Sequence, residues 1–179
     1  VHTFSYPTVA SPIEENAIRL ADTCLKQCSG TTHLVGHSLG GLVILAMLAN
    51  EQGPNVGRVV LLGTPLNGSR VARRLGSNRV TGWMLGHASP ALSNGLGLPE
   101  PVTECGMISG TMPRGLGRLT GDFGEPNDGT VAVSETCSER LADRIELAVS
   151  HTGLLFSSEV ARQTAVFIDR GRFERSERP

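Results

Sequence analysis

Ser38 is the residue whose setting most clearly indicates chemistry, because it lies in Gly36-His37-Ser38-Leu39-Gly40-Gly41, between a short apolar run at 33–35 and the helix-forming run 42–50. A serine on a sharp strand-to-helix turn needs small residues two positions before and after it, and Gly36 and Gly40 provide them. The turn places the hydroxyl at a helix N-terminus, which favours negative charge. Although such a motif also arises by chance in a chain with 22 glycines, the flanking elements favour Ser38 as a nucleophile.

A serine nucleophile requires a histidine base that a carboxylate holds in place. In proteins with this kind of turn the chain order is serine, acid, histidine, so His87 and His151 are the candidate bases. His151 follows a predicted strand at 144–149, and the carboxyl ends of parallel strands are where ligands bind. His87 lies in an irregular segment. We therefore favour His151.

Asp128 is the favoured acid, because it lies in the turn-rich segment 126–131 that follows a predicted strand. Asp122 is its nearest rival. Asp143 precedes a strand and is expected at the opposite edge of the sheet. An aspartate followed by glycine is also a common turn signal, so the ordered set of three residues carries the assignment rather than Asp128 alone.

Strand and helix signals alternate along the chain and predict a single α/β domain over 1–179. Its expected architecture is a three-layer α/β/α sandwich with a mainly parallel sheet of about five strands. The predicted strands are 1–6, 32–35, 58–62, 104–109 and 144–149. Helices are predicted to begin at Ser11-Pro12, with Ser11 as the N-cap, and to cover 38–52, 69–75, 134–141 and 157–170. The charged tail 171–179 is expected to fray.

A segment dense in glycine, proline, serine and leucine, 76–101, is predicted to be a cap-like insertion, with a disordered excursion as the alternative. Its large apolar side chains have two interpretations, an acyl pocket or the core of a small helical subdomain. These side chains are Trp83, Met84, Leu85, Leu92, Leu96 and Leu98.

Composition excludes several classes of function. A net charge of −1 and a pI near 6.6 give no field that would gather nucleic acid or anionic lipid. No apolar run approaches the roughly 18 residues of a membrane span. The cysteines lack zinc-site spacing. Cys24 and Cys28 share an apolar helix face, and the sequence does not decide whether Cys105 and Cys137 form a disulfide. The chain starts at Val1 with no leader, so the cytoplasm is only slightly favoured over secretion.

These motifs together resemble the α/β-hydrolase superfamily, and most closely its small bacterial lipases and esterases with little or no lid. The segment 34–41 is similar to their nucleophile elbow, and Leu62-Gly63-Thr64-Pro65 to the segment after the next strand. Asn127-Asp128-Gly129-Thr130-Val131 resembles their acid loop, and 151–158 their histidine loop.

The resemblance implies a carboxylester hydrolase that acts on small esters or lipids without a metal or organic cofactor. Ser38 would attack the ester carbonyl, His151 would act as general base and then general acid, and Asp128 would orient the imidazole. The Leu39 N–H would donate one hydrogen bond to the oxyanion.

The sequence departs from this family upstream of Ser38, because no His-Gly pair marks a second oxyanion donor there. The strand and helix that carry it are expected to be missing, unless an N–H near 6–8 substitutes. Losing one donor typically lowers turnover on the order of 100- to 1,000-fold. A silent hydrolase-like binding domain and an acyltransferase with the same triad are therefore alternatives. An exposed strand edge would favour a homodimer.

Overall fold

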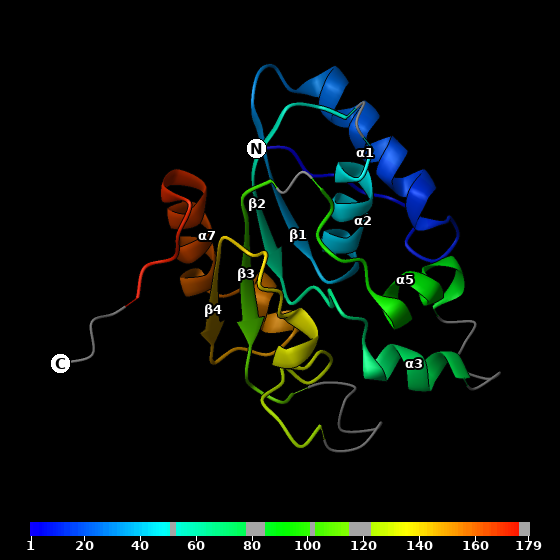
Figure 1. Ribbon diagram of the computed structural model, residues 1–179, viewed down its shortest axis with the longest axis vertical. Helices are drawn as coiled ribbons and strands as arrows, with labels where there is room; N and C mark the ends of the chain where they lie inside the picture. The colour runs from blue at the N-terminus through cyan, green and yellow to red at the C-terminus, as the bar shows by residue number, and fades with distance from the viewer. Residues whose placement is uncertain (51–52, 78–84, 101–102, 115–122, 176–179) are drawn as a thin grey trace.

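The computed structural model describes residues 1–50, 53–77, 85–100, 103–114 and 123–175. Strands and helices alternate along these segments, as the sequence predicts (Figure 1). The strands are β1 (Thr32–His37), β2 (Val56–Leu62), β3 (Cys105–Gly110) and β4 (Asp143–Leu147). The α-helices are α1 (Ile13–Gln27), α2 (Leu39–Leu48), α3 (Arg70–Ser77), α5 (Ser89–Asn94) and α7 (Ser158–Arg170). Short 3₁₀ turns are η1 (Gly86–Ala88), η2 (Val133–Thr136) and η3 (Thr152–Leu155).

The described strands form one parallel sheet in the order β1-β2-β3-β4. Their register places His37 opposite Leu62, Leu62 opposite Ile108, and Ile108 opposite Ile145. Because all four strands run in the same direction, their carboxyl ends meet at one edge of the sheet. That edge carries the segments that follow β1, β2, β3 and β4.

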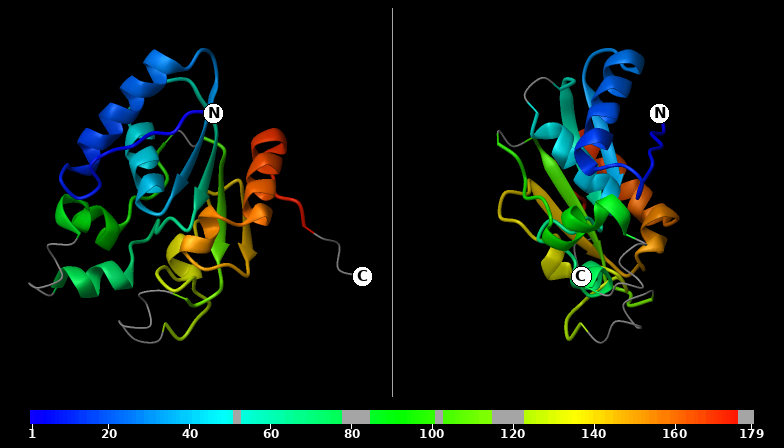
Figure 2. Two further views of the ribbon diagram at one scale, coloured as in Figure 1. Left: turned by 180° about the vertical axis from the view of Figure 1, so that it is seen from behind. Right: turned by 90° about the vertical axis from the view of Figure 1, so that its right-hand side faces the viewer.

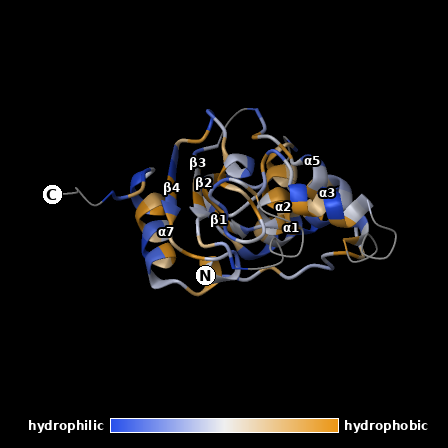
Figure 3. Ribbon diagram, turned by 90° about the horizontal axis from the view of Figure 1, so that it is seen from below, coloured by the Kyte–Doolittle hydropathy of each residue, from blue (hydrophilic) through white to orange (hydrophobic). Residues whose placement is uncertain are grey.

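Helices cover both faces of the sheet, which confirms the predicted three layers. In Figure 3 α7 lies on one side of the strands, and α1 and α2 lie on the other. Figure 2 shows the same layers from behind and from the side. Strand β2 alternates between the two cores, with Val59 and Leu61 facing the α1–α2 side and Val60 and Leu62 the α7 side. A parallel strand buried on both faces reads as a continuous apolar run, as 59–62 does.

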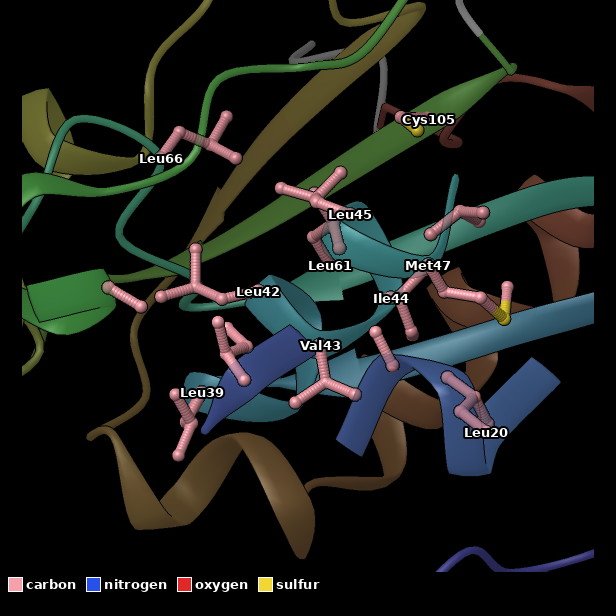
Figure 4. Close-up of a cluster of buried hydrophobic side chains, with 14 of the residues drawn as sticks. Leu20, Leu39, Leu42, Val43, Ile44, Leu45, Met47, Leu61, Leu66 and Cys105 are labelled. Atoms are coloured by element: carbon pink, nitrogen blue, oxygen red, sulfur yellow. The ribbon is translucent and has the colours of Figure 1, made fainter. Parts of the chain in front are cut away.

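Helix α2 is apolar all round and lies at the centre of the larger core (Figure 4). Leu42 and Leu45 are fully buried in this core. This packing fixes the position of the helix N-terminus, directly after Ser38. Leu98 is buried in the same core, and Leu92 and Leu96 pack against it, which favours the core interpretation for these three insertion residues. Trp83 and Met84 lie outside the described residues.

The N-terminal segment corrects one prediction, because residues 1–6 form no strand. Phe4 and Tyr6 stack on each other with ring centroids 5.5 Å apart and pack against the α1–α2 core. Their alternation therefore reflects side-chain burial rather than pairing within a sheet. Among the described strands β1 is an edge, and Val35 is 47% exposed there.

Local differences from the sequence predictions occur at two helix boundaries. Helix α1 begins after Pro12, which stands at the N-cap position expected for Ser11 and forms no side-chain cap. The helix predicted over 134–141 is a single turn, η2, because Cys137 is already extended. The other predicted helix and strand positions differ by a few residues from those observed, and α7 begins after Ser157, whose side chain caps Val160 N–H.

The first part of the charged tail is ordered, contrary to the expectation of fraying. Phe173 is buried against Phe167, with ring centroids 4.8 Å apart. Its N–H donates to Asp143 Oδ2 at 2.8 Å, and Arg175 also donates to the Asp143 carboxylate. The apolar side chain and the carboxylate together fasten residues 171–175 to β4.

The four cysteines are free thiols in the described structure, which answers the question of a Cys105–Cys137 bridge. Burial raises the pKa of the Cys105 thiol to about 11, so this cysteine is an inert core residue. The helices of the described segments are too short or too polar to cross a bilayer.

Candidate active site

Ser38 lies in a strained turn between β1 and α2. With φ 52° and ψ −120°, it is the one non-glycine residue at positive φ among the described residues. Its N–H donates to Leu62 C=O at 2.9 Å, which extends the β1–β2 pairing to the turn itself. A non-glycine residue persists in this conformation only where its surroundings enforce it, and such strain clusters at functional sites. The turn is the sharp strand-to-helix bend that the sequence predicts.

The turn is packed most tightly at Gly36 and Gly41, where a side chain would not fit. A Cβ on Gly36 would lie 2.7 Å from the Gly41 backbone, and a Cβ on Gly41 would lie 2.0 Å from Thr64 Oγ1. The prediction is therefore right for Gly36. It is wrong for Gly40, where a Cβ would make only an ordinary contact, 3.6 Å from the Tyr6 hydroxyl. The crowding arises where α2 crosses the ends of β1 and β2.

The Asp128 carboxylate is held by its own turn. Asp128 Oδ1 accepts the N–H groups of Thr130 at 2.9 Å and Val131 at 2.7 Å. The side chain is 1% exposed. Because both backbone donors bind Oδ1, the second oxygen, Oδ2, remains available for another partner.

That partner is His151, which lies after β4. Its Nδ1 is 2.6 Å from Asp128 Oδ2, and its backbone N–H donates to Asp128 C=O at 2.9 Å. A carboxylate only accepts hydrogen bonds, so Nδ1 carries the proton and neutral His151 has its lone pair on Nε2. The His151 side chain is 13% exposed. An imidazole in this tautomer can accept a proton at Nε2.

Two glycines at the carboxyl ends of β2 and β3 make room for this pair. A Cβ on Gly63, which has φ 56°, would lie 3.1 Å from Asp128 Oδ2 and 3.3 Å from His151 Nδ1. A Cβ on Gly110 would lie 2.8 Å from Asp128 Cβ and 2.5 Å from Val149 C=O. The carboxylate and the imidazole therefore lie directly over the ends of the central strands.

The structure also brings His151 next to the residue that precedes Ser38. The rings of His37 and His151 have centroids 4.6 Å apart, and His37 Nε2 is 2.9 Å from His151 C=O. Among the hydrogen bonds of the described residues, none joins the Ser38 hydroxyl to the His151 ring. Catalytic hydrogen bonds are often long without substrate and tighten in the reactive complex. The geometry thus pairs Asp128 with His151 and sets both beside the Ser38 turn.

Solved structures with this architecture include lipases. The chain matches the mature form of the lipase BlEst2 from Bacillus licheniformis with a TM-score of 0.71 and 19% identity, over 93% of this chain and 76% of that one. The propeptide form matches with a TM-score of 0.74 and 18% identity, over 97% of this chain and 43% of that one. The NocB thioesterase domain in covalent complex with a fluorophosphonate nocardicin G analog matches with a TM-score of 0.52 and 20% identity, over 90% and 75% of the two chains.

The chain has an α/β-hydrolase fold. No protein-family model matches it, and no curated protein matches it in sequence. At these identities the likeness concerns the fold, so the chemistry of the site rests on the residues themselves.

Two of the rival candidates, His87 and Asp143, do not join this site. His87 lies in η1, where its N–H donates to Val9 C=O at 3.0 Å. Asp143 begins β4 and therefore lies at the opposite edge of the sheet, as predicted. Asp122 lies outside the described residues.

A buried carboxylate that the sequence analysis did not single out braces the acid loop of this α/β-hydrolase fold. Glu135 is 4% exposed, and its Oε2 accepts the Ala132 N–H at 2.9 Å. Its Oε1 accepts from Arg70, from the backbone N–H at 2.7 Å and from Nε at 3.2 Å. Arg70 also pairs with Glu125 and lies over the ring of Phe123. The sequence feature that could have indicated this role is a glutamate in the first turn of a helix, where its side chain can accept a backbone N–H.

His37 is a second residue that sequence reasoning missed. Burial lowers its pKa, and the nearby His151 lowers it further, against smaller opposite effects of its hydrogen bond to His151 C=O and of Asp128. The ring is therefore neutral at neutral pH. The histidine within the elbow motif was visible in the sequence, but no pattern indicated which partner it would have.

The N-terminus of α2 supplies one backbone donor close to Ser38. Leu39 is the first residue of α2, so its N–H has no acceptor within the helix. The segment predicted to substitute for the second donor is not a strand, but it does pass this helix, since the Tyr6 hydroxyl lies near Gly40. Burial raises the pKa of Tyr6. A donor role for the N–H groups of 6–8 stays a prediction.

A cavity of about 650 Å³ adjoins the turn. It lies between the N-terminal segment, α1 and the exposed edge of β1, and Phe4, Tyr6 and Val43 contribute apolar walls while His37 and Gly40 border it. Within the described residues, no group of three or more potential metal ligands comes together.

Proposed function

We propose that the protein is a serine carboxylester hydrolase with Ser38 as nucleophile, His151 as general base and Asp128 as the orienting acid. The observation that carries the proposal is the hydrogen-bonded Asp128–His151 pair beside the strained Ser38 turn. The fold supports it, because a lipase, in two forms, and a thioesterase domain have similar structures.

In the first half of the reaction the Ser38 hydroxyl attacks the ester carbonyl while His151 Nε2 accepts its proton. Asp128 Oδ2 keeps the proton on Nδ1 and stabilises the imidazolium that forms. The Leu39 N–H donates to the oxyanion at the positive end of the α2 dipole. The imidazolium then returns the proton to the leaving alcohol, which leaves an acyl-enzyme.

In the second half a water molecule takes the place of the alcohol. His151 accepts a proton from the water, which attacks the acyl carbonyl and releases the acid, and Ser38 recovers its proton. No metal or organic cofactor takes part. A chain with a net charge of −1 has no strong field to attract charged ligands, so we expect neutral small esters or lipids as substrates.

Hydrolysis of p-nitrophenyl esters of increasing acyl length tests this proposal. Wild type should release p-nitrophenol, and Ser38→Ala should lower kcat by several orders of magnitude without loss of folding. Ser77→Ala is the matched control, because Ser77 is an exposed serine on α3 that bonds only to Arg74 C=O among its described contacts. Equal rates for wild type and Ser38→Ala would reject the role of Ser38.

A silent hydrolase-like binding domain is the second candidate function, favoured because the Leu39 N–H is the one oxyanion donor that we assign among the described residues. Losing one of two oxyanion donors typically lowers turnover on the order of 100- to 1,000-fold. A fluorophosphonate probe separates the two, since a serine activated by its base is labelled even where turnover is slow. Wild type that stays unlabelled would support the silent domain.

An acyltransferase would use the same acyl-enzyme and differ only in the acceptor. Competition between water and an added alcohol measures this directly. A ratio of transfer product to hydrolysis product far above the ratio of alcohol to water would favour the transferase. A product ratio close to the ratio of alcohol to water would favour the hydrolase.

A homodimer is the partner that the fold favours, because β1 presents an unpaired edge among the described strands, with Val35 half exposed. Sedimentation of the purified chain tests it. A single species at the mass of 18.9 kDa would exclude the dimer.

A further inference from the structure

His37 is polar, partly buried and not used by the proposed mechanism, although it immediately precedes Ser38. It is the last residue of β1, and its backbone lies opposite Leu62 of β2. The pairing with β2 therefore fixes the backbone of His37, and its side chain projects from the strand end that carries the Ser38 turn.

The side chain of His37 contacts His151 in two ways. Its Nε2 lies 2.9 Å from His151 C=O, and the two rings lie 4.6 Å apart at an angle of 47°. A carbonyl oxygen only accepts hydrogen bonds, so His37 Nε2 is the donor and carries a proton. The neutral ring therefore has its proton on Nε2 and its lone pair on Nδ1.

Two other hydrogen bonds hold His151, and Asp128 is the acceptor in both. Asp128 Oδ2 binds the ring at Nδ1, and Asp128 C=O accepts the backbone N–H. These contacts fix His151 relative to the acid loop after β3. Among the described residues, the hydrogen bond that ties His151 to the strand carrying Ser38 is the one from His37.

We propose that His37 is a positioning residue that sets the separation between the His151 imidazole and the Ser38 hydroxyl by clamping His151 C=O to the end of β1. This inference rests on the proposed function. Without the clamp, no hydrogen bond of the described residues ties His151 to β1, and a displacement of about 1 Å at a reacting atom can cost on the order of 100-fold in rate.

Three variants separate the hydrogen bond from the packing of the ring. His37→Gln places an amide N–H near the position of Nε2 and keeps the donor. His37→Phe keeps a flat ring without a donor, and His37→Leu removes both. We expect kcat for p-nitrophenyl ester hydrolysis to fall about 10- to 100-fold in the Phe and Leu variants. The Gln variant should remain within a few-fold of wild type, and KM should change less than about twofold in all three.

His33→Leu is the matched control, because His33 lies on the same strand, is exposed and accepts the Arg58 N–H at 2.9 Å, with no hydrogen bond to Asp128 or His151 among the described residues. Its kcat should equal that of wild type. Thermal unfolding of every variant shows whether a loss of rate accompanies a loss of folding. Equal losses in the Gln and Phe variants, or a Phe variant as active as wild type, would overturn the clamp.

A measurement on the unaltered protein covers the case in which the variants do not fold. Long-range ¹H–¹⁵N NMR of the histidine rings reports the tautomer, and His37 should be neutral with its proton on Nε2 at neutral pH. A neutral ring with its proton on Nδ1 would contradict the donor role. These results stay distinct from failure of the proposed function, in which wild type itself would lack ester hydrolysis and fluorophosphonate labelling.

Discussion

Asp128 shows how a single buried carboxylate can be assigned to chemistry rather than to turn structure. One oxygen is occupied by two backbone N–H groups of the turn, and the other faces His151 Nδ1. A turn aspartate needs only the first set of contacts. The second contact links it to an imidazole 23 residues further along the chain, and this link is what the proposed mechanism uses.

Asp128→Asn tests this role at the residue scale. The amide can still accept the turn N–H groups, but an NH₂ group facing His151 would favour the tautomer protonated on Nε2, which cannot accept the Ser38 proton. We expect kcat to fall on the order of 10⁴-fold with little change in KM.

Asp169→Asn is the control for loss of a carboxylate, since Asp169 is exposed near the end of α7. Steady-state kinetics and thermal unfolding of both variants are the measurements. An Asp128→Asn protein that is folded and retains more than a tenth of wild-type kcat would contradict the assignment.

Residue types and order were sufficient to predict Ser38, Asp128 and His151 as candidates, because each follows a strand whose carboxyl end lies at one edge of a parallel sheet. The sequence could not predict the contacts of His37 and Glu135. Both depend on the register between segments far apart in the chain, such as the pairing of the acid loop with α3 through Arg70. Local patterns carry no such information.

At the scale of elements, the ends of the strands decide how closely the acid and the base approach the sheet. Gly63 illustrates this, because its positive φ bends the chain away from β2 while its missing side chain leaves space for Asp128 and His151. A change there acts on the site through the strand end rather than through a reacting atom.

Gly63→Ala is expected to lower both stability and activity. The new Cβ would lie 2.8 Å from Leu154 Cδ1 and close to the Asp128–His151 pair. We expect a loss of about 1–3 kcal/mol in the free energy of unfolding, together with a fall in kcat of about tenfold or more.

Gly30→Ala separates strain from steric contact. Gly30 also has a positive φ, 79°, but a Cβ there would meet nothing within 4 Å. This variant should lose about 1 kcal/mol with an unchanged kcat. Denaturant unfolding and ester hydrolysis of both proteins provide the comparison, and equal kcat values for the two variants would refute the proposed crowding at Gly63.

Glu135→Ala tests the brace between α3 and the acid loop. Removing the carboxylate leaves the N–H groups of Ala132 and Arg70 without their acceptor. An unsatisfied buried donor costs about 1–3 kcal/mol, so we expect a total loss of about 3 kcal/mol in the free energy of unfolding.

Glu125→Ala removes the other carboxylate that pairs with Arg70, from a more exposed position. Such a pair contributes about 0–1 kcal/mol. Urea unfolding ranks the two variants, and a Glu125→Ala loss as large as that of Glu135→Ala would show that the buried bonds to the backbone do not matter.

The predicted strand 1–6 shows where element prediction fails in physical terms. The segment has strand-forming residues and an alternating pattern, but a strand also requires a neighbour to which it can hydrogen-bond. Its two aromatic rings instead pack on the core of α1 and α2. In contrast, 59–62 is apolar throughout and belongs to β2, which pairs with β1 on one side and β3 on the other. Composition and pairing therefore both favour a strand there.

At the scale of the whole molecule, one carboxylate, that of Asp143, fastens residues 173–175 to the sheet. Burial raises the pKa of Asp143, but this effect is outweighed by hydrogen bonds from Arg175 and from the N–H groups of Phe173 and Arg144, so the pKa lies below its ordinary value of 3.8. A carboxyl group with a lowered pKa in the folded state stabilises the fold above its unfolded pKa. That contribution is lost as the pH falls through the folded-state value.

The stability difference between wild type and Asp143→Asn should therefore depend on pH. At pH 6 wild type should be more stable by about 1–3 kcal/mol, and the difference should shrink progressively below about pH 4. Urea unfolding of both proteins at pH 6 and pH 3 measures it. A difference of the same size at both pH values would show that the charge on Asp143 does not hold the tail.

In the proposed mechanism the folded molecule activates Ser38 and no other serine. Reaction of the wild-type protein with a fluorophosphonate probe, followed by peptide mapping of the adduct by mass spectrometry, tests it most directly. We expect one adduct per chain, on the peptide containing Ser38, and none after heat unfolding. An adduct on a different residue, or a folded wild-type protein that takes up no probe, would contradict it.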